Sequence, residues 1–259
     1  MKTRTVWRLF GIFSLVATAM LAVGLTLGIR DIIHPTPVSW KADQTGESSG
    51  VHKTSHKLQI TALGDSLTRG TGDESGLGYA GNLRIRLAEN TKQEVYVYNN
   101  GVNGYKAANL LKDLRTKPDI RRQVQQADMI VLSIGGNDLF YTQSDEVKPD
   151  VIRTRIPAAL TNYKAIVSIV TELNPKAKLL YMGLYNPFPD LPNAKESAKV
   201  VQEWNNGVTQ VLYEYPQAIF VPTDDLFRSD GMKYISSDHF HPNQAGYKRI
   251  GERMADVLK

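Results

Sequence analysis

The 259-residue sequence contains no cysteine. Disulfide bonds, cysteine-based zinc sites and a thiol nucleophile are therefore excluded from this chain. A disordered or fibrous protein is excluded as well, because 42% of the residues are hydrophobic and 22% are charged, as in ordinary globular domains. The length suits one α/β domain with a short appendage.

Most of the sequence also lacks an excess of basic residues. The formal net charge is +5, but residues 1–31 alone contribute +3, and the remainder carries 27 basic and 25 acidic residues without a dense basic run. Nucleic-acid-binding domains carry such basic patches, so we expect no nucleic-acid partner. No group of residues has the spacing of zinc ligands, and we expect neither a metal nor another cofactor.

The first thirty residues hold a long uncharged segment. Leu9–Ile29 spans 21 residues without a charge, and a helix needs about 20 residues to cross the hydrocarbon core of a bilayer. Basic side chains precede the segment, which favours a cytoplasmic N-terminus. We therefore expect residues 1–30 to be a single-pass membrane anchor with the rest of the chain outside the cytoplasm. Small residues at Ala17–Ala19 and Ala22–Gly24 leave a second interpretation open, a cleaved signal peptide and a secreted protein.

Residues 31–57 separate this segment from the rest of the chain. They contain Pro35, Pro37 and a glycine- and serine-rich stretch, with little periodic hydrophobicity. This composition is typical of a flexible linker. A single folded domain is therefore expected over residues 58–259.

In that domain, short apolar runs alternate with segments of helical spacing. The expected strands cover residues 58–63, 94–98, 129–134, 178–184 and 219–221. The expected helices cover residues 79–90, 107–117, 119–126, 157–173, 195–213 and 242–258, the last with Pro242 in its first turn. Several strands are apolar throughout, as in a sheet that is covered on both faces. We predict an α/β fold, a three-layer α/β/α sandwich whose five-stranded, mostly parallel sheet has the order 2-1-3-4-5.

Four polar or glycine-rich segments follow the predicted strands. They are Gly64–Leu67, Gly101–Gly104, Gly135–Asp138 and Asp238–Pro242. In an open parallel sheet, ligands bind outside the carboxyl ends of the strands, so we expect these segments to meet at one edge. Together they supply a serine, a histidine with a nearby carboxylate, and several hydrogen-bond donors.

These residue types suit the cleavage of an ester by a serine nucleophile. A serine hydroxyl needs a base that takes its proton, and a histidine held in one tautomer by a carboxylate serves as that base. Ser66 is the candidate nucleophile, His241 the candidate base, and Asp238 the group that orients it. An oxyanion needs preorganised N–H donors, for which the N–H groups of Ser66 and Gly104 and the side-chain amide of Asn137 are candidates.

The four segments, in this order, resemble the sequence blocks of the SGNH/GDSL hydrolases. The matching residues are Gly64-Asp65-Ser66-Leu67, Asn99-x-Gly101-x-x-Gly104, Gly135-Gly136-Asn137-Asp138 and Asp238-x-x-His241-Pro242-Asn243. The resemblance covers about residues 58–259 and implies the flavodoxin-like fold of these enzymes, in a bacterial, membrane-anchored or secreted esterase or lipase. It implies a Ser66–His241–Asp238 triad and an oxyanion hole completed by Gly104 and Asn137. It implies lipase, lysophospholipase, thioesterase or carbohydrate O-deacetylase activity, and the expected location outside the cytoplasm points to esters of lipids, lysophospholipids or cell-wall O-acyl groups.

Each of these residues also has a purely structural interpretation. Ser66 suits a helix cap, Asn137 a turn, and His241 a place before a helix-opening proline. His239 is an alternative base, and Gly101 is an alternative donor to the oxyanion. One shared site explains all of these residues together, whereas the structural interpretation needs a separate reason for each.

Aromatic residues after the third and fourth strands are candidates for an acyl pocket. Phe140 and Tyr141 follow the asparagine segment, and Tyr185 and Phe188 follow the fourth strand. Packing within the loops is the alternative for these residues, and Asp65 is expected to brace its loop rather than to react. Two other functions stay open, an acyltransferase that uses the same acyl-enzyme and a non-catalytic surface-binding domain.

Overall fold

The computed structural model describes residues 13, 17–21, 57–140, 148–188, 192–229 and 231–259. The chain separates into two compact units, Met1–His52 and Lys53–Lys259. In the first unit the described residues are helical and exposed, and no helix in the described part of the chain is long and apolar enough to cross a bilayer. Most of the predicted anchor over residues 1–30, and all of the predicted linker except Lys57, lie outside the described residues.

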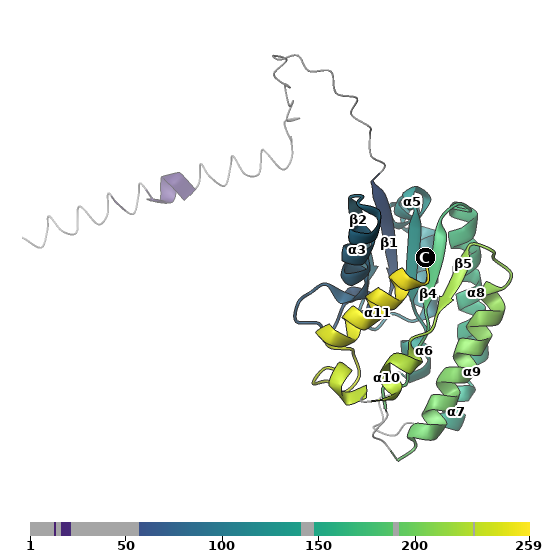
Figure 1. Ribbon diagram of the computed structural model, residues 1–259. Helices are drawn as coiled ribbons and strands as arrows, with labels where there is room; N and C mark the ends of the chain where they lie inside the picture. The colour runs from purple at the N-terminus through teal and green to yellow at the C-terminus, as the bar shows by residue number, and fades with distance from the viewer. Residues whose placement is uncertain (1–12, 14–16, 22–56, 141–147, 189–191, 230) are drawn as a thin grey trace, which may run out of the picture. The chain divides into compact units, whose positions relative to one another are not determined.

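Five parallel strands form the sheet of the second unit (Figure 1). They are β1 (Leu58–Gly64), β2 (Val95–Gly101), β3 (Met129–Ser133), β4 (Lys178–Met182) and β5 (Ala218–Val221). Their order across the sheet is β2-β1-β3-β4-β5, which confirms the predicted topology. In the register, Gly64 lies opposite Gly101 on one side and Ser133 on the other. The segments that follow β1, β2 and β3 therefore start at the same level of one sheet edge.

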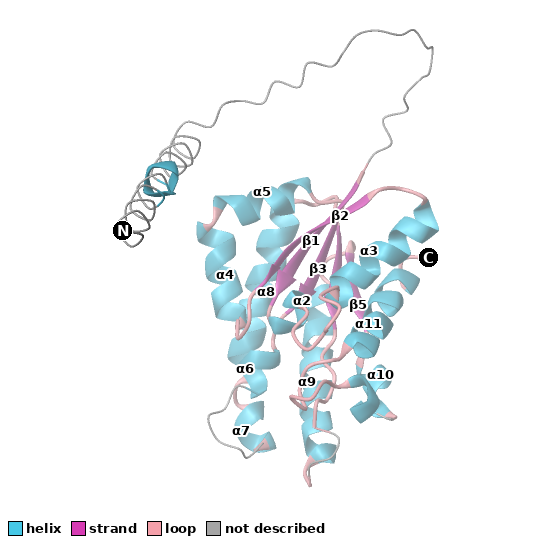
Figure 2. Ribbon diagram, turned by 90° about the vertical axis from the view of Figure 1, so that its left-hand side faces the viewer, coloured by secondary structure: helices cyan, strands magenta, loops and turns pink. Residues whose placement is uncertain are grey.

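Helices cover both faces of the sheet. They are α2 (Ser66–Arg69), α3 (Gly78–Thr91), α4 (Ala107–Thr116), α5 (Pro118–Gln126), α6 (Gly136–Phe140), α7 (Pro149–Arg153), α8 (Ile156–Leu173), α9 (Ala194–Leu212), α10 (Asp224–Arg228) and α11 (Gln244–Asp256), with a 3₁₀ turn, η1, at Gly231–Tyr234. The sheet lies between α4 and α8 on one side and α3 and α11 on the other (Figure 2). This is the predicted three-layer sandwich.

The core consists of two hydrophobic clusters, one on each face of the sheet. They are separate because successive side chains of a strand point to opposite faces. Leu63 and Leu132 pack with α4, α5, α8 and α9 on one face. Ile60 and Val131 pack with α3 and α11 on the other face. Because helices cover both faces, all five residues of β3 are buried, and this explains its almost continuous apolar run.

Four boundaries differ from the prediction by two or more residues, and one of them is the end of the last helix, which lies at Asp256 and not at residue 258. The last helix begins at Gln244 and not at Pro242, because the side chain of Asn243 accepts a hydrogen bond from Gly246 N–H and caps the helix there. Pro242 instead pairs with Ile235 in an isolated bridge. Strand β4 ends at Met182, two residues before the predicted end. Strand β2 continues to Gly101 through two asparagines whose side-chain amides find acceptors on neighbouring elements.

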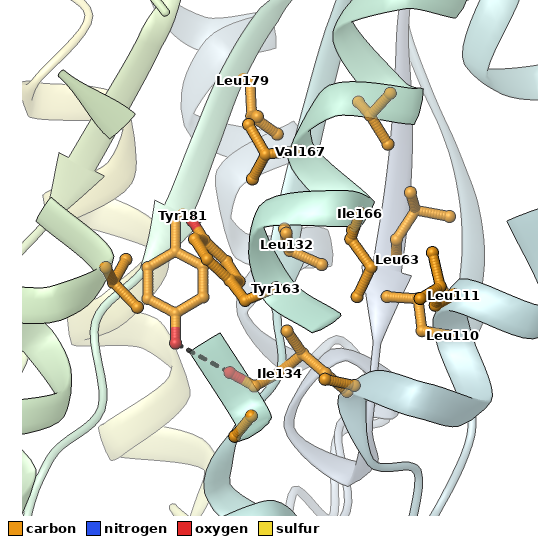
Figure 3. Packing of buried hydrophobic residues seen from close by; sticks show 14 of the residues in the cluster. Leu63, Leu110, Leu111, Leu132, Ile134, Tyr163, Ile166, Val167, Leu179 and Tyr181 are labelled. Carbon is orange, nitrogen blue, oxygen red and sulfur yellow. Dashed lines mark hydrogen bonds between the residues drawn. The ribbon is translucent and has the colours of Figure 1, made fainter. Parts of the chain in front are cut away.

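A cluster of buried aromatic side chains lies under the loop that follows β3. The hydroxyl of Tyr181 donates to the carbonyl of Ile134 at 2.7 Å (Figure 3) and accepts from the indole N–H of Trp204 at 2.9 Å. Gly135 adopts φ of 114°, and a Cβ there would lie 2.3 Å from the Trp204 ring. Only glycine fits this position, so the cluster fixes the path of the chain into α6, which carries Asn137.

Candidate active site

The candidate nucleophile follows directly from the end of β1. Gly64 closes the strand with φ of 151°, and a Cβ there would lie 2.0 Å from the Ser133 carbonyl. The next residue, Asp65, caps α2 by accepting a hydrogen bond from Leu67 N–H at 3.0 Å. Ser66 is therefore the first residue of α2 and not its cap. Its N–H has no carbonyl one turn back in the helix to accept it.

Asp65 braces this turn from below, as expected. Its carboxylate also accepts a hydrogen bond from the Ser133 hydroxyl at 3.0 Å, and Ser133 is in turn bonded to Thr68. The side chain is fully buried. Burial raises the pKa of Asp65 to about 7, although hydrogen bonds from Leu67 N–H and Ser133 oppose that rise.

Ser66, His241 and Asp238 form one chain of hydrogen bonds across the sheet edge. The hydroxyl Oγ of Ser66 lies 2.7 Å from His241 Nε2, and His241 Nδ1 lies 2.6 Å from Asp238 Oδ2. His241, and not the exposed His239, is the histidine that reaches the serine. Ser66 and His241 are 175 residues apart in the sequence, and the fold brings them together.

Asp238 is held as a carboxylate by its surroundings. Its Oδ1 accepts hydrogen bonds from the backbone N–H groups of Phe240 and His241, both at 2.9 Å, and from the Ser236 hydroxyl at 2.7 Å. Partial burial raises the pKa of Asp238, but the hydrogen bonds from His241, Ser236 and the backbone outweigh burial and hold the value at about 2. The group therefore keeps its charge throughout the neutral range.

The candidate oxyanion donors line the same cleft as Ser66 and His241. Gly104 adopts φ of 76°, with open space where a side chain would project. Asn137 lies near the start of α6, and its amide donates one hydrogen bond to the Tyr105 carbonyl at 3.0 Å. Because the amide has two N–H groups, this bond fixes its orientation and leaves one donor for a ligand.

Gly101, the alternative donor, is engaged elsewhere. Its N–H donates to the side-chain oxygen of Asn99 at 2.9 Å. A Cβ on Gly101 would lie 2.2 Å from the backbone nitrogen of Arg69 in α2, so this glycine allows close packing of α2 on β2. Gly104 is therefore the glycine of this segment that faces the cleft.

The cleft has a volume of about 290 Å³, and its lining residues are Ser66, Thr71, Asn103, Gly104, Asn137, Phe140, Phe240 and His241. A narrow apolar pocket of about 20 Å³ shares Ser66, Asn137, Phe140 and Phe240 with this cleft, and Leu184, Tyr185 and Pro187 add to its walls. Two of the predicted acyl-pocket residues, Phe140 and Tyr185, thus lie beside the serine. Phe188 packs behind them, with its ring 5.4 Å from Phe140 and 5.9 Å from Phe240, and Tyr141 lies outside the described residues.

Phe240 was not predicted from the sequence. Its ring lies edge-on to the His241 imidazole at 5.0 Å, and it lines both the cleft and the apolar pocket. It occupies a variable place in the Asp-x-x-His pattern, so no sequence signal marks it. Across the described ranges, no three histidine, aspartate or glutamate side chains gather in a way that would hold a metal ion.

The arrangement has the parts that acyl transfer to a serine requires. A hydroxyl is hydrogen bonded to an imidazole, the imidazole is oriented by an ionised carboxylate, and N–H donors line the cleft beside the hydroxyl. The apolar side chains beside the serine suit a hydrocarbon group, and Thr71 and Asn103 in the cleft suit a hydrated leaving group.

The sequence matches a known hydrolase family over most of the folded unit. The sequence model of the GDSL-like Lipase/Acylhydrolase family matches residues 62–249. The spore germination lipase LipC of Bacillus licheniformis is 29% identical over 210 residues, which cover 76% of this chain and 94% of the lipase. The protein YpmR of Bacillus subtilis is 31% identical over 255 residues, 96% of each chain.

Solved structures show the same fold. The lipase Lip_vut3 from a goat rumen metagenome superposes with a TM-score of 0.70 at 27% identity, over 78% of this chain and 97% of that one. The family 3 carbohydrate esterase of Clostridium thermocellum superposes with a TM-score of 0.59 at 19% identity, over 78% and 97% of the two chains. The second likeness concerns the fold alone.

Proposed function

The chain belongs to the GDSL-like lipase/acylhydrolase family and is a carboxylic ester hydrolase, and from this premise we propose that it works through an acyl-enzyme on Ser66. Ser66 Oγ attacks the ester carbonyl while His241 Nε2 takes the hydroxyl proton. The tetrahedral intermediate collapses, and His241 returns the proton to the departing alcohol oxygen. A water molecule then attacks the acyl-enzyme with His241 as base again, and the second collapse releases the carboxylic acid and restores Ser66.

One observation supports this proposal above all: Ser66 is hydrogen bonded to His241 at 2.7 Å, and His241 is hydrogen bonded to Asp238 at 2.6 Å. The ionised Asp238 accepts a hydrogen bond from His241 Nδ1–H and so holds the tautomer in which Nε2 carries no proton and is able to receive the one from Ser66. It also stabilises the imidazolium that forms when the proton moves. The N–H groups of Ser66 and Gly104 and the amide of Asn137 are the proposed donors to the oxyanion.

The proposed substrates are acyl esters of lipids, with the acyl chain along the apolar wall. The walls that Phe140, Tyr185 and Phe240 form beside Ser66 support this choice. The similarity to the spore germination lipase LipC and to the goat rumen lipase supports it further. An alcohol with polar groups would lie toward Thr71 and Asn103, which also line the cleft.

Hydrolysis of p-nitrophenyl esters of increasing chain length tests the proposal. The full chain, in a mild detergent, is expected to hydrolyse acetate, butyrate and octanoate esters, and Ser66→Ala is expected to lose this activity to the background of the assay. If both proteins are inert on every ester, or if both are equally active, the proposed mechanism is wrong. The chain-length profile of an active wild type then separates short-chain esterases from lipases of long acyl chains.

The proposal includes a location. The uncharged segment Leu9–Ile29 and the basic residues before it support a single-pass anchor with the catalytic unit outside the cytoplasm. Fractionation of cells that express the full chain is expected to recover the protein in the membrane and to leave it accessible to protease added from outside. Recovery in the soluble cytoplasmic fraction would contradict this location.

A further inference from the structure

The turn Ser236–Pro242, which carries both Asp238 and His241, is held mainly by bonds within itself. Asp238 binds two backbone N–H groups of the turn, and Ser236 N–H donates to the His241 carbonyl at 2.7 Å. His239 lies in the left-handed region with φ of 56°, where a residue other than glycine is strained. A strained residue of this kind keeps its conformation only when several contacts together fix the turn around it.

Tyr185 supplies such a contact from the carboxyl end of β4. Its hydroxyl donates to the carbonyl of Phe240 at 2.7 Å, across 55 residues of sequence. The ring is 5% exposed and stacks on Phe227 of α10, with the ring centres 4.2 Å apart and the planes 26° apart. The phenol is therefore anchored in the core, and its hydroxyl reaches out to the turn.

The two bonds to the Phe240–His241 peptide act on a single rigid unit. A peptide group is planar, so the Phe240 carbonyl and the His241 N–H move together. Tyr185 holds the carbonyl at 2.7 Å, and Asp238 holds the N–H at 2.9 Å. The Cα of His241 is part of this peptide plane. The fixed plane therefore sets the direction of the bond from Cα to the imidazole side chain.

We propose that Tyr185 is a positioning residue for the catalytic histidine, which it holds through the Phe240 carbonyl. The sequence suggested only that its ring borders an acyl pocket. The hydroxyl points to the turn instead and keeps His241 Nε2 at hydrogen-bond distance from Ser66. This inference rests on the proposed function, because it assigns to Tyr185 a part in the reaction of that same site.

Tyr185→Phe removes only the hydroxyl and keeps the stacked ring. With one hydrogen bond to the turn lost, we expect kcat to fall about 5- to 10-fold, with KM within twofold of wild type. The rate at which a fluorophosphonate labels Ser66 is expected to fall by a similar factor. If Tyr185 had a purely structural role, Tyr185→Phe would lower the free energy of unfolding and leave kcat per labelled active site unchanged.

Tyr163→Phe is the matched control. Tyr163 is also a fully buried tyrosine, but its hydroxyl has no hydrogen-bond partner in the described structure. It lies in α8, against Tyr181, and not at the turn. We expect this variant to keep the wild-type kcat, because removal of an unpaired buried hydroxyl breaks no bond.

Proton NMR separates the possible outcomes. Wild type is expected to show a downfield signal from His241 Nδ1–H bonded to Asp238, and Tyr185→Phe is expected to shift or broaden it, while Tyr163→Phe leaves it in place.

If Tyr185→Phe proves unstable, Phe227→Leu, which loosens the ring but keeps the hydroxyl, is expected to change kcat and the signal in the same direction. An active wild type with an unchanged Tyr185→Phe variant would overturn the positioning role alone. A wild type that is inert on every ester would overturn the proposed function, and the NMR signal would still report on the positioning.

Discussion

Replacement of Asn137 by alanine tests the proposed oxyanion hole. In the structure, one N–H of the Asn137 amide is bonded to the Tyr105 carbonyl at 3.0 Å, and the side chain lines the cleft beside Ser66. Asn137→Ala removes the donor that remains for the substrate without changing Ser66, His241 or the backbone of α6. The variant therefore separates stabilisation of the transition state from formation of the triad.

Two magnitudes follow from these contacts. Loss of one oxyanion donor costs about 3 kcal/mol in the transition state, so we expect kcat to fall about 100- to 1000-fold. We expect KM to stay within about threefold, because the charge on the oxygen develops only after the substrate is bound. Loss of the bond to the half-buried Tyr105 carbonyl lowers the free energy of unfolding by about 1 kcal/mol, too little to unfold an ordinary domain.

Asn174→Ala is the matched control for the same assay. The Asn174 amide is buried far from the cleft and donates to the carbonyls of Val124 and Ala127, each at 2.8 Å. Its loss is expected to lower the free energy of unfolding by about 2–4 kcal/mol and to leave kcat of the folded enzyme unchanged. Steady-state kinetics with a soluble ester, together with urea unfolding, measure both quantities. If Asn137→Ala keeps kcat within threefold of wild type, the assignment of Asn137 to the oxyanion hole is refuted.

Two further variants test the electrostatics of the site. Asp238→Asn is expected to lower kcat about 10³- to 10⁴-fold, because an amide in place of the carboxylate favours the wrong tautomer of His241; a loss below tenfold would argue against the triad. Asp65→Asn tests the buried carboxyl, whose pKa is raised by burial to about 7. The folded protein binds this proton more tightly than the unfolded chain, so Asp65 contributes stability below pH 4 that is lost as the pH rises to about 7. Urea unfolding at pH 4.5 and 7.5 is expected to show a smaller fall in stability for Asp65→Asn than for wild type, and equal falls would contradict the assignment.

The order of the strands and the edge that carries the site follow from the sequence. Continuous apolar strands such as Met129–Ser133 indicate a parallel sheet, and in such a sheet every strand presents its carboxyl end to the same edge. Ser66, Asn137 and His241 each lie just beyond such an end or on the turn that faces it. Their common location is therefore a consequence of the sheet topology, and it is predictable without any knowledge of side-chain positions.

Contacts that depend on the conformation of a side chain could not be predicted in the same way. The choice between Gly101 and Gly104 depends on Asn99, whose side chain occupies the Gly101 N–H. The bond between Tyr185 and Phe240 joins two loops that no periodic pattern relates. These features depend on rotamers and on the exact approach of loops, and sequence patterns carry no information on either.

Short elements form the second group that the sequence did not reveal. The helices α2 and α6, which carry Ser66 and Asn137, have four and five residues, too few for an apolar period of 3.6 residues to be visible. They form because glycines at Gly64 and Gly135 turn the chain sharply at the strand ends. The segments that carry the candidate site are thus the parts of this fold where hydrophobic periodicity is least informative.

The most direct test of the central claim is to identify the residue that a fluorophosphonate modifies. Trypsin is expected to release Ser66 within the peptide Leu58–Arg69, and mass spectrometry of the labelled wild type is expected to place the adduct on Ser66. His241→Ala is expected to label far more slowly, since the serine then lacks its base. An enzyme that hydrolyses esters but carries no adduct, or carries it on another serine, would contradict the account of this site.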